Sequence, residues 1–291
     1  MATQFRVVFD TNAFAPGNFE FLEKSPMRRL CHIGRVVPVY GHIFLEETLC
    51  AYGAEGKREE LVQRWLPFIA ATVDRFCDDF IGIWHKELVE GHGPNTNIYM
   101  RRRDQDRLLS HFPRIPLDGT WRAWHDSKHA RAVDDAKRAA QRETSKAIRR
   151  EITDWRKAVR YQPKRHGVVR LDQYFEREVD VAGRKFLPAL VKCKDPHAVA
   201  DRWSRAKMQY PYFTVFIINM LYIAYHAMSK HNEKIDLNAQ ADLDLMTHLM
   251  HADALVSNEI GFLRQAFDDL WRPRGKVIYT SDEFVDLIRR F

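Results

Sequence analysis

Short apolar runs alternate with helical segments at both ends of this chain, and this alternation strongly restricts its fold. Residues 5–9 (FRVVF) and 35–40 (RVVPVY) are rich in β-branched and aromatic side chains, and each precedes a segment with helical periodicity. Residues 253–257 (DALVS) and 276–280 (KVIYT) repeat the pattern near the C-terminus. Consecutive β-α units favour a parallel sheet with helices on both faces, so the sequence predicts an α/β fold.

The segments between these runs are predicted to be helices. Gly34 follows a cationic turn and should end the first of them, while Ser281 and Glu283 stand where a cap and a first-turn acid would begin the last. The predicted helices cover residues 18–34, 42–53, 58–70, 241–252, 259–271 and 281–291.

The middle of the chain has a different pattern. Residues 1–74 and 236–291 are expected to form the α/β core, and residues 75–235 a mostly helical insertion. Residues 121–159 are charged, rich in alanine and free of Gly and Pro, which predicts long exposed helices. The apolar run 211–228 barely reaches the length of a membrane span and contains Asn219, so a buried helix is the expectation.

Basic residues are concentrated in the insertion. The formal net charge of the chain is +7, and residues 97–170 carry 20 Lys and Arg against 9 Asp and Glu. Such a segment is either a solvated helical face or a surface that contacts nucleic-acid phosphates. The consecutive residues Arg101, Arg102 and Arg103 are the candidate contacts.

The cysteines and the N-terminal segment bear on the cellular compartment. The four cysteines, Cys31, Cys50, Cys77 and Cys193, lack the close spacing of a zinc ribbon or a redox pair. The N-terminal residues do not have the pattern of a secretory signal. A cytoplasmic location is therefore expected.

Acidic residues occur where the predicted strands end or the predicted helices begin. In a parallel sheet these positions meet at the carboxyl edge, where ligands bind. The residues are Asp10, Glu46, Glu47, Asp242, Asp244 and Glu259.

Carboxylates that gather at one edge repel one another unless a cation compensates their charge. Oxygen ligands without His or Cys at matching spacing favour Mg²⁺ or Mn²⁺. Any one of these acids alone could instead stabilise a helix N-terminus by about 0.3–1 kcal/mol.

Three segments of the chain, VVFDTNAF, HIFLEETL and HADALVSNEIGF, together resemble the PIN-domain nucleases. The resemblance covers residues 5–70 and 236–291 and implies a PIN-like parallel-sheet core that cleaves RNA, or DNA in some branches, with bound metal ions. It leaves the basic insertion unexplained.

The resemblance also implies roles for individual residues. The four metal-binding acids fall on Asp10, Glu47, Asp242 and Glu259, with Glu46 and Asp244 as alternates for the second and third. Thr11 and Asn12 would orient the first acid and the attacking water, and Ser257 matches a hydroxyl common in the family. Glu259 departs from the family, which more often has Asp there. Asp253 precedes its strand and is expected to be structural.

The expected function is thus that of a Mg²⁺- or Mn²⁺-dependent endonuclease, most readily an endoribonuclease, that leaves a 3′-hydroxyl and a 5′-phosphate. RNA or single-stranded DNA would be the partner, held by the arginines and by Trp121, Trp124 and Trp155, although burial in the core is the favoured interpretation of each tryptophan taken singly. A protein inhibitor such as an antitoxin stays open as a second partner.

Two alternatives to a nuclease share parts of this pattern. A non-catalytic nucleic-acid-binding or assembly module could retain the same fold. A phosphatase of the haloacid-dehalogenase type would also have an aspartate after its first strand, but it requires a second acid where this chain has Asn12.

Overall fold

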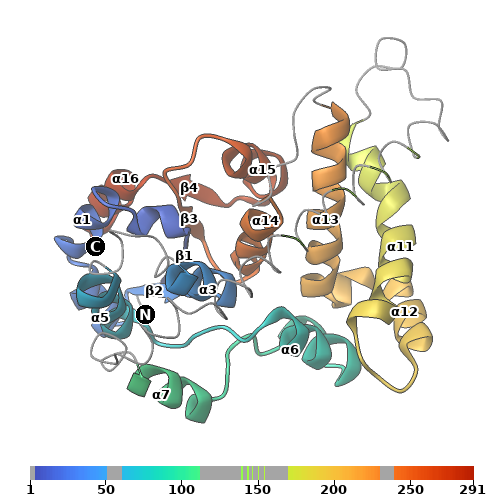
Figure 1. The fold of residues 1–291 in the computed structure, drawn as a ribbon, viewed down its shortest axis with the longest axis horizontal. Coiled ribbons are helices and arrows are strands. Elements are labelled where there is room, and N and C mark those ends of the chain that lie inside the picture. The colour runs from blue at the N-terminus through green and yellow to red at the C-terminus, as the bar shows by residue number, and fades with distance from the viewer. Residues whose placement is uncertain are drawn as a thin grey trace. The chain divides into compact units, whose positions relative to one another are not determined.

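The structure is a computed structural model that describes residues 4–50, 61–111, 170–229 and 239–291, with isolated positions between 139 and 154. Its internal contacts divide the chain into two compact units (Figure 1). Unit 1 comprises Met1–Asp79, Ile98–Ala132 and Leu245–Phe291, and unit 2 comprises Phe80–Asn97 and Val133–Asp244. The contacts thus assign Ile98–Ala132 to unit 1, whereas the division made from the sequence places these residues in the insertion.

Unit 1 contains a four-stranded parallel sheet, which confirms the predicted α/β class. Its strands are β1 (Phe5–Phe9), β2 (Val36–Val39), β3 (Ala254–Val256) and β4 (Val277–Tyr279), in the order β2-β1-β3-β4. The central strands are buried, as parallel strands covered on both faces usually are. Phe9 pairs with Val256, so β1 and β3 end at the same level.

The strand order creates a switch point between β1 and β3. The chain crosses from β1 to β2 in one direction and from β3 to β4 in the other. Right-handed crossovers then place the β1–β2 helices and the β3–β4 helix on opposite faces of the sheet. The carboxyl ends of β1 and β3 therefore lie at the position where open α/β sheets usually bind ligands.

The helices of unit 1 surround this sheet. Within the described residues they are α1 (Asn18–Glu23), α2 (Met27–His32), α3 (His42–Cys50), α5 (Leu66–Thr72), α7 (Arg102–His111), α15 (Phe262–Leu270) and α16 (Ser281–Ile288), with the shorter turns η1 (Thr11–Phe14), η3 (Leu61–Trp65), η7 (His248–Met250) and η8 (Arg272–Arg274). The buried ring of Phe14 contacts the rings of Phe19, Phe44 and Phe68, which anchors the turn after β1 in the core.

The first predicted helix is two helices, so the prediction of one continuous helix over residues 18–34 was wrong. Pro26 lacks an N–H and disfavours helical geometry at Ser25, and α1 therefore ends before them. The Ser25 hydroxyl donates to the Leu22 carbonyl at 2.6 Å and accepts from the Met27 N–H at 3.2 Å, which begins α2. Gly34 follows α2 with φ of +70°, as predicted for a helix end.

The cap of the last helix also differs from the prediction. Thr280, not Ser281, is the N-cap of α16, and it forms a capping box with Glu283. Ser281 is a buried residue of the first helical turn. Both residues are hydroxyl-bearing, and the sequence pattern does not distinguish them.

Unit 2 is helical within the described residues. Its elements are α6 (Phe80–Trp84), η4 (His85–Val89), η5 (Gly93–Asn95), α11 (Leu171–Leu190), α12 (Pro196–Arg205), η6 (Lys207–Gln209), α13 (Pro211–Ser229) and the start of α14 (Ala239–Thr247). The ring of Trp203 lies against Gly183 of α11 so closely that a Cβ there would be 2.0 Å from its Cη2 atom. This contact explains a glycine in the middle of a 20-residue helix.

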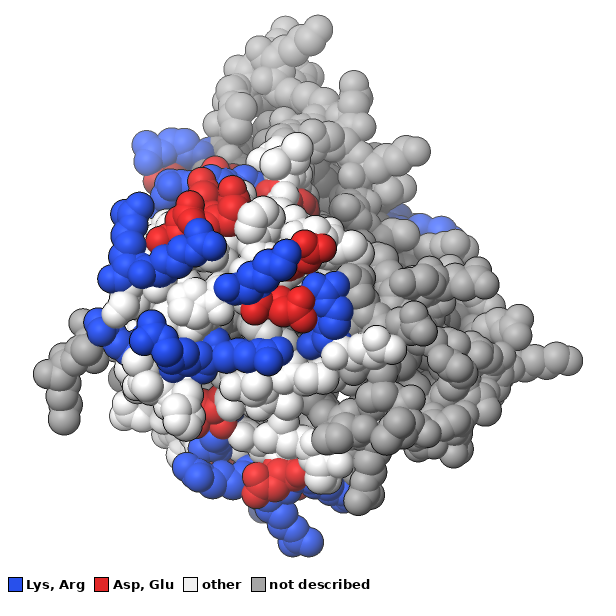
Figure 2. All heavy atoms as spheres, turned by 90° about the vertical axis from the view of Figure 1, so that its left-hand side faces the viewer, with Lys and Arg blue, Asp and Glu red and all other residues white. Residues whose placement is uncertain are grey.

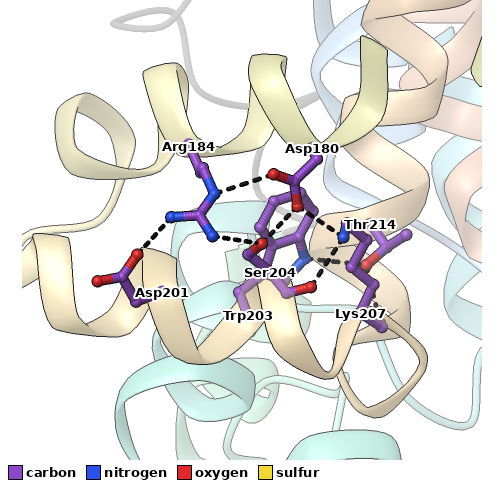
Figure 3. Close-up of polar contacts among 7 residues, drawn as sticks. All are labelled: Asp180, Arg184, Asp201, Trp203, Ser204, Lys207 and Thr214. Carbon is purple, nitrogen blue, oxygen red and sulfur yellow. Dashed lines mark hydrogen bonds and ion pairs between the residues drawn. The ribbon is translucent and has the colours of Figure 1, made fainter. Parts of the chain in front are cut away.

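A polar network joins α11 to α12 and the turn after it (Figure 3). Asp180 accepts from Arg184 at 2.9 Å, from Lys207 at 2.6 Å and from Ser204. Burial alone would raise the pKa of Asp180, but these hydrogen bonds lower it to about 2. Arg184 also reaches Asp201 of α12.

The buried helix predicted over residues 211–228 corresponds to α13, which has Asn219 in its interior face, bonded to the Leu243 carbonyl at 2.8 Å. Among the described helices, none combines the length and the apolar character that a membrane crossing requires. Most of residues 121–159, with Trp121, Trp124 and Trp155, and the beginning of the helix predicted over residues 58–70 lie outside the described residues.

Candidate functional site

Asp10 follows β1 at the switch point. Its N–H donates to the Val256 carbonyl at 3.0 Å and so continues the β1–β3 ladder by one residue. This pairing places Asp10 beside Ser257, whose hydroxyl donates to Asp10 Oδ2 at 2.7 Å. Asp10 is 5% exposed and Ser257 is 1% exposed, so this contact is almost fully screened from solvent.

Asn12 links the ends of the two strands. Its Nδ2 donates to Ser257 Oγ at 3.2 Å, and its Oδ1 accepts the backbone N–H of Asn258 at 3.0 Å. The N–H of Glu259 also donates to Ser257 Oγ, at 3.1 Å.

Thr11 connects this group to α3. Its hydroxyl lies 3.0 Å from Oε2 of Glu47 and 3.4 Å from Oδ1 of Asp10. The single hydroxyl proton is best directed to Glu47, the nearer acceptor. We call Asp10, Thr11, Asn12, Glu47, Ser257, Asn258 and Glu259 the Asp10 cluster.

Burial dominates the electrostatics of Asp10. It raises the pKa of the Asp10 carboxyl above its ordinary value, and the hydrogen bond from Ser257 opposes this shift only in part. An ionised carboxylate in such a place is costly unless an opposite charge lies nearby. A cation at the cluster would supply that charge.

The carboxylate of Glu259 contacts the helix that follows it in the chain. Its Oε1 accepts the N–H of Leu263 at 3.3 Å, in the first turn of α15. A Cβ at Gly261 would lie 3.2 Å from the same oxygen, so the carboxylate folds back over its own loop. The side chain that the resemblance assigns to a metal thus also accepts one N–H from the first turn of α15.

The third predicted acid, Asp242, and its alternate, Asp244, belong to unit 2. Asp242 lies in the first turn of α14. Asp244 accepts from Gln240 at 2.7 Å, and burial raises its pKa to about 7. Glu46 lies in α3, and its side chain is outside the described part of the chain.

The three candidate arginines stand at the start of α7 in unit 1. Arg101, Arg102 and Arg103 are exposed, and within the described residues no ion pair joins them to Asp104 or Asp106. Helix α7 is fixed by Gln105, whose buried side chain accepts the Phe76 N–H at 3.0 Å and donates to the Asp74 carbonyl at 2.7 Å. Phe76 in turn pairs with Tyr40, the residue after β2, so α7 is tied to the end of that strand.

The donor atoms of the Asp10 cluster suit a hard cation. The cluster offers carboxylate, hydroxyl and amide oxygens, which match Mg²⁺ or Mn²⁺ better than zinc. In the described ranges, no three His, Cys, Asp or Glu side chains are grouped as a metal site. Mg²⁺ requires only one or two carboxylates because it keeps several waters, so Asp10 and Glu47 would fit it.

Two contributors to this region were not identified from the sequence. Asn258 Nδ2 donates to Ser281 Oγ at 2.8 Å, and its Oδ1 accepts the Ser281 N–H at 3.1 Å. A signal was present, since Ser257–Glu259 and Thr280–Ser281 each follow a strand of the same parallel sheet. The polar residues after β4 could therefore have been grouped with those after β1 and β3.

Comparisons of the chain with protein-family models, with curated proteins and with solved structures gave no significant match in any of the three. The PIN-like assignment therefore stays a prediction that rests on the residues quoted above.

Proposed function

We propose that this protein is a Mg²⁺- or Mn²⁺-dependent endoribonuclease with the Asp10 cluster as its reaction centre. The observation that supports it most is the position of Asp10 and Glu47. Asp10 follows β1 and Glu47 lies within α3, the helix after β2, and the Thr11 hydroxyl lies within hydrogen-bond distance of both. Asp10 also stands at the switch point of a parallel sheet, where such folds bind ligands.

The residues of the Asp10 cluster would have different roles in the reaction. Asp10 and Glu47 would bind the cation, and Ser257 and Asn12 hold the Asp10 carboxylate in place. A bound divalent cation supplies a nucleophilic water at neutral pH and neutralises charge on the phosphate. The water oxygen would bond to phosphorus, the bond to the 3′ oxygen would break, and that oxygen would take a proton. The products would carry a 3′-hydroxyl and a 5′-phosphate.

The other predicted residues would assist Asp10 and Glu47 in binding the cation or the substrate. Asp242 stays a predicted further ligand, and Glu259 would bind the cation through Oε2, because Oε1 accepts the Leu263 N–H. Arg101, Arg102 and Arg103 would bind the phosphates of the strand, because they are exposed and lack acidic partners among the described residues. A protein such as an antitoxin could act by covering the cluster.

A second candidate is a nucleic-acid-binding or assembly module without catalysis. It is favoured by Glu259, because the carboxylate assigned as fourth ligand already accepts an N–H from the first turn of α15. A protein that retained these acidic residues only to accept helix N–H groups would show the same contact between Glu259 and Leu263.

Cleavage of labelled single-stranded RNA and DNA, with Mn²⁺ or with EDTA, separates the two. Asp10→Asn removes one negative charge and should lower Mn²⁺-dependent RNA cleavage by at least about 100-fold. Asp253→Asn is the matched control, because Asp253 lies at the opposite end of β3, where its carboxylate accepts the Arg6 N–H at 2.8 Å. RNA that is bound but left intact by the wild type would establish the second candidate instead.

A further inference from the structure

Asn258 connects the Asp10 cluster to the beginning of α16. Its side chain forms a reciprocal pair with Ser281, donating to Oγ and accepting from N–H, and Ser281 is 1% exposed. Its backbone N–H faces the other way and donates to Asn12 Oδ1. Asn258 thus contacts α16 through its side chain and contacts Asn12 of the cluster through its backbone N–H.

The backbone N–H of Asn258 fixes the orientation of the Asn12 amide. A donor at 3.0 Å requires the Asn12 oxygen to face it, which turns the Asn12 Nδ2 group toward Ser257. The opposite orientation would set two N–H donors against each other.

The orientation of Asn12 in turn directs the Ser257 hydroxyl. Ser257 Oγ accepts from Asn12 Nδ2 and from the Glu259 N–H, so both of its acceptor positions are used. Its one proton has two acceptors in reach, Asp10 Oδ2 at 2.7 Å and Asn12 Oδ1 at 3.5 Å, and the nearer one is Asp10. In the hydrogen-bonded series Asn258, Asn12, Ser257 and Asp10, each residue therefore donates to the next.

We propose that Asn258 is a positioning residue of the Asp10 cluster, which acts through Asn12 and Ser257 on the carboxylate of Asp10. The contacts with Ser281 hold the turn after β3, and this turn presents the N–H that orients Asn12. The inference rests on the proposed function in one respect, namely that Asp10 binds the cation.

The first measurement uses the metal-free protein, so that it does not depend on catalysis. Exchange of the Asn12 side-chain amide protons with solvent, followed by NMR, should become about tenfold faster in Asn258→Ala and in Ser281→Ala, because a loosened turn would no longer hold Asn12 Nδ2 in its hydrogen bond with Ser257 Oγ. Asn95→Ala, at an exposed position of unit 2, should leave this exchange unchanged.

The second measurement is the affinity for Mn²⁺ alone, determined from the electron paramagnetic resonance signal of the free ion. Asn258→Ala should weaken binding by about 10- to 100-fold, the usual effect of removing a residue that orients a ligand. The double variant Asn12→Ala, Asn258→Ala should bind no more weakly than Asn12→Ala, because the two residues act in series. An effect of Asn258 on the site that did not pass through Asn12 would give additive losses of affinity, and a contact that only stabilised α16 would give no loss in Asn258→Ala.

The outcomes distinguish this inference from the proposed function. Unchanged amide exchange in Asn258→Ala, or additive losses in the double variant, would overturn the positioning role. Faster exchange in a protein whose wild type binds no Mn²⁺ would support the orientation of Asn12 by Asn258 and would refute the metal-dependent function.

Discussion

At the scale of residues, position 41 requires glycine because of a side chain that is far away in the sequence but adjacent in space. It precedes α3, and a Cβ at this position would lie 2.3 Å from Nε2 and 2.4 Å from Cδ2 of His248. His248 is fully buried, and burial, followed by the nearby His42, lowers its pKa to about 3. The neutral ring therefore fills the space that any larger residue at position 41 would need.

Gly41→Ala is predicted to lower the free energy of unfolding by about 1–3 kcal/mol, because a fully buried ring cannot withdraw from the added methyl group. Chemical denaturation measures the change. In the double variant Gly41→Ala, His248→Ala, the methyl group has room, so the combined loss should be smaller than the sum of the single losses. Strictly additive losses would show that the two residues do not compete for this space.

At the scale of elements, the start of α13 depends on a carboxyl group from another helix. Glu87 of η4 accepts the N–H of Tyr212 at 2.8 Å and that of Phe213 at 2.9 Å, two groups that lack partners within their own helix. Glu87 is fully buried, and burial raises its pKa to about 8, although the bond from Phe213 opposes the shift.

This raised pKa predicts a pH-dependent stability. The stabilisation linked to Glu87 is fully present below the ordinary glutamate pKa, near 4.5, and is lost as the pH rises through about 8. The free energy of unfolding of the wild type relative to Glu87→Gln should therefore fall between pH 5 and 8, by at most about 1.4 kcal/mol per pH unit. Urea denaturation at several pH values tests this, and a difference independent of pH would contradict it.

The elements also show what the sequence could and could not predict. The strands and the end of α2 at Gly34 have local signals, namely β-branched runs and a glycine that adopts positive φ. The break at Ser25–Pro26 had a local signal too, but the apolar pattern across it suggested one helix. The cap at Thr280 was missed because its neighbour Ser281 carries the same functional group.

The candidate site, too, could be predicted from the sequence only in part. Grouping polar residues by strand ends requires only the strand positions, and the structure brings Asp10, Asn12, Glu47 and Ser257 together at one edge. The Asn258–Ser281 pair and the Gly41–His248 contact join residues far apart in the chain. Such contacts depend on how elements pack, which a single sequence does not specify.

For the whole molecule, metal binding should be linked to stability. A cation that binds only the folded chain stabilises it by mass action, by about 2.7 kcal/mol at a concentration 100 times the dissociation constant. Mn²⁺ is predicted to raise the melting temperature of the wild type, EDTA to reverse the rise, and Asp10→Asn to abolish it. Asp253→Asn should keep the rise, and a wild-type melting temperature indifferent to Mn²⁺ would contradict the proposed site.

Charge over the whole chain is unevenly distributed, although the described surface has both signs. Figure 2 shows one face on which Lys and Arg lie among Asp and Glu. Exposed pairs of this kind contribute little, about 0–1 kcal/mol each. A binding role for Arg101, Arg102 and Arg103 therefore has to be distinguished from the general effect of a net charge of +7.

Replacing these three arginines by alanine makes that distinction. If each binds one phosphate of a single strand, the logarithmic dependence of affinity on salt should become shallower by about 2, at about 0.7 per phosphate. Binding should weaken alike for all sequences, while Mn²⁺ affinity stays unchanged, because Gln105 holds α7 independently of the arginines. The control replaces the exposed Arg272, Arg289 and Arg290, which changes the net charge equally. If both triple variants gave the same salt dependence, the arginines of α7 would contribute only their charge, and the strand would have to be bound elsewhere.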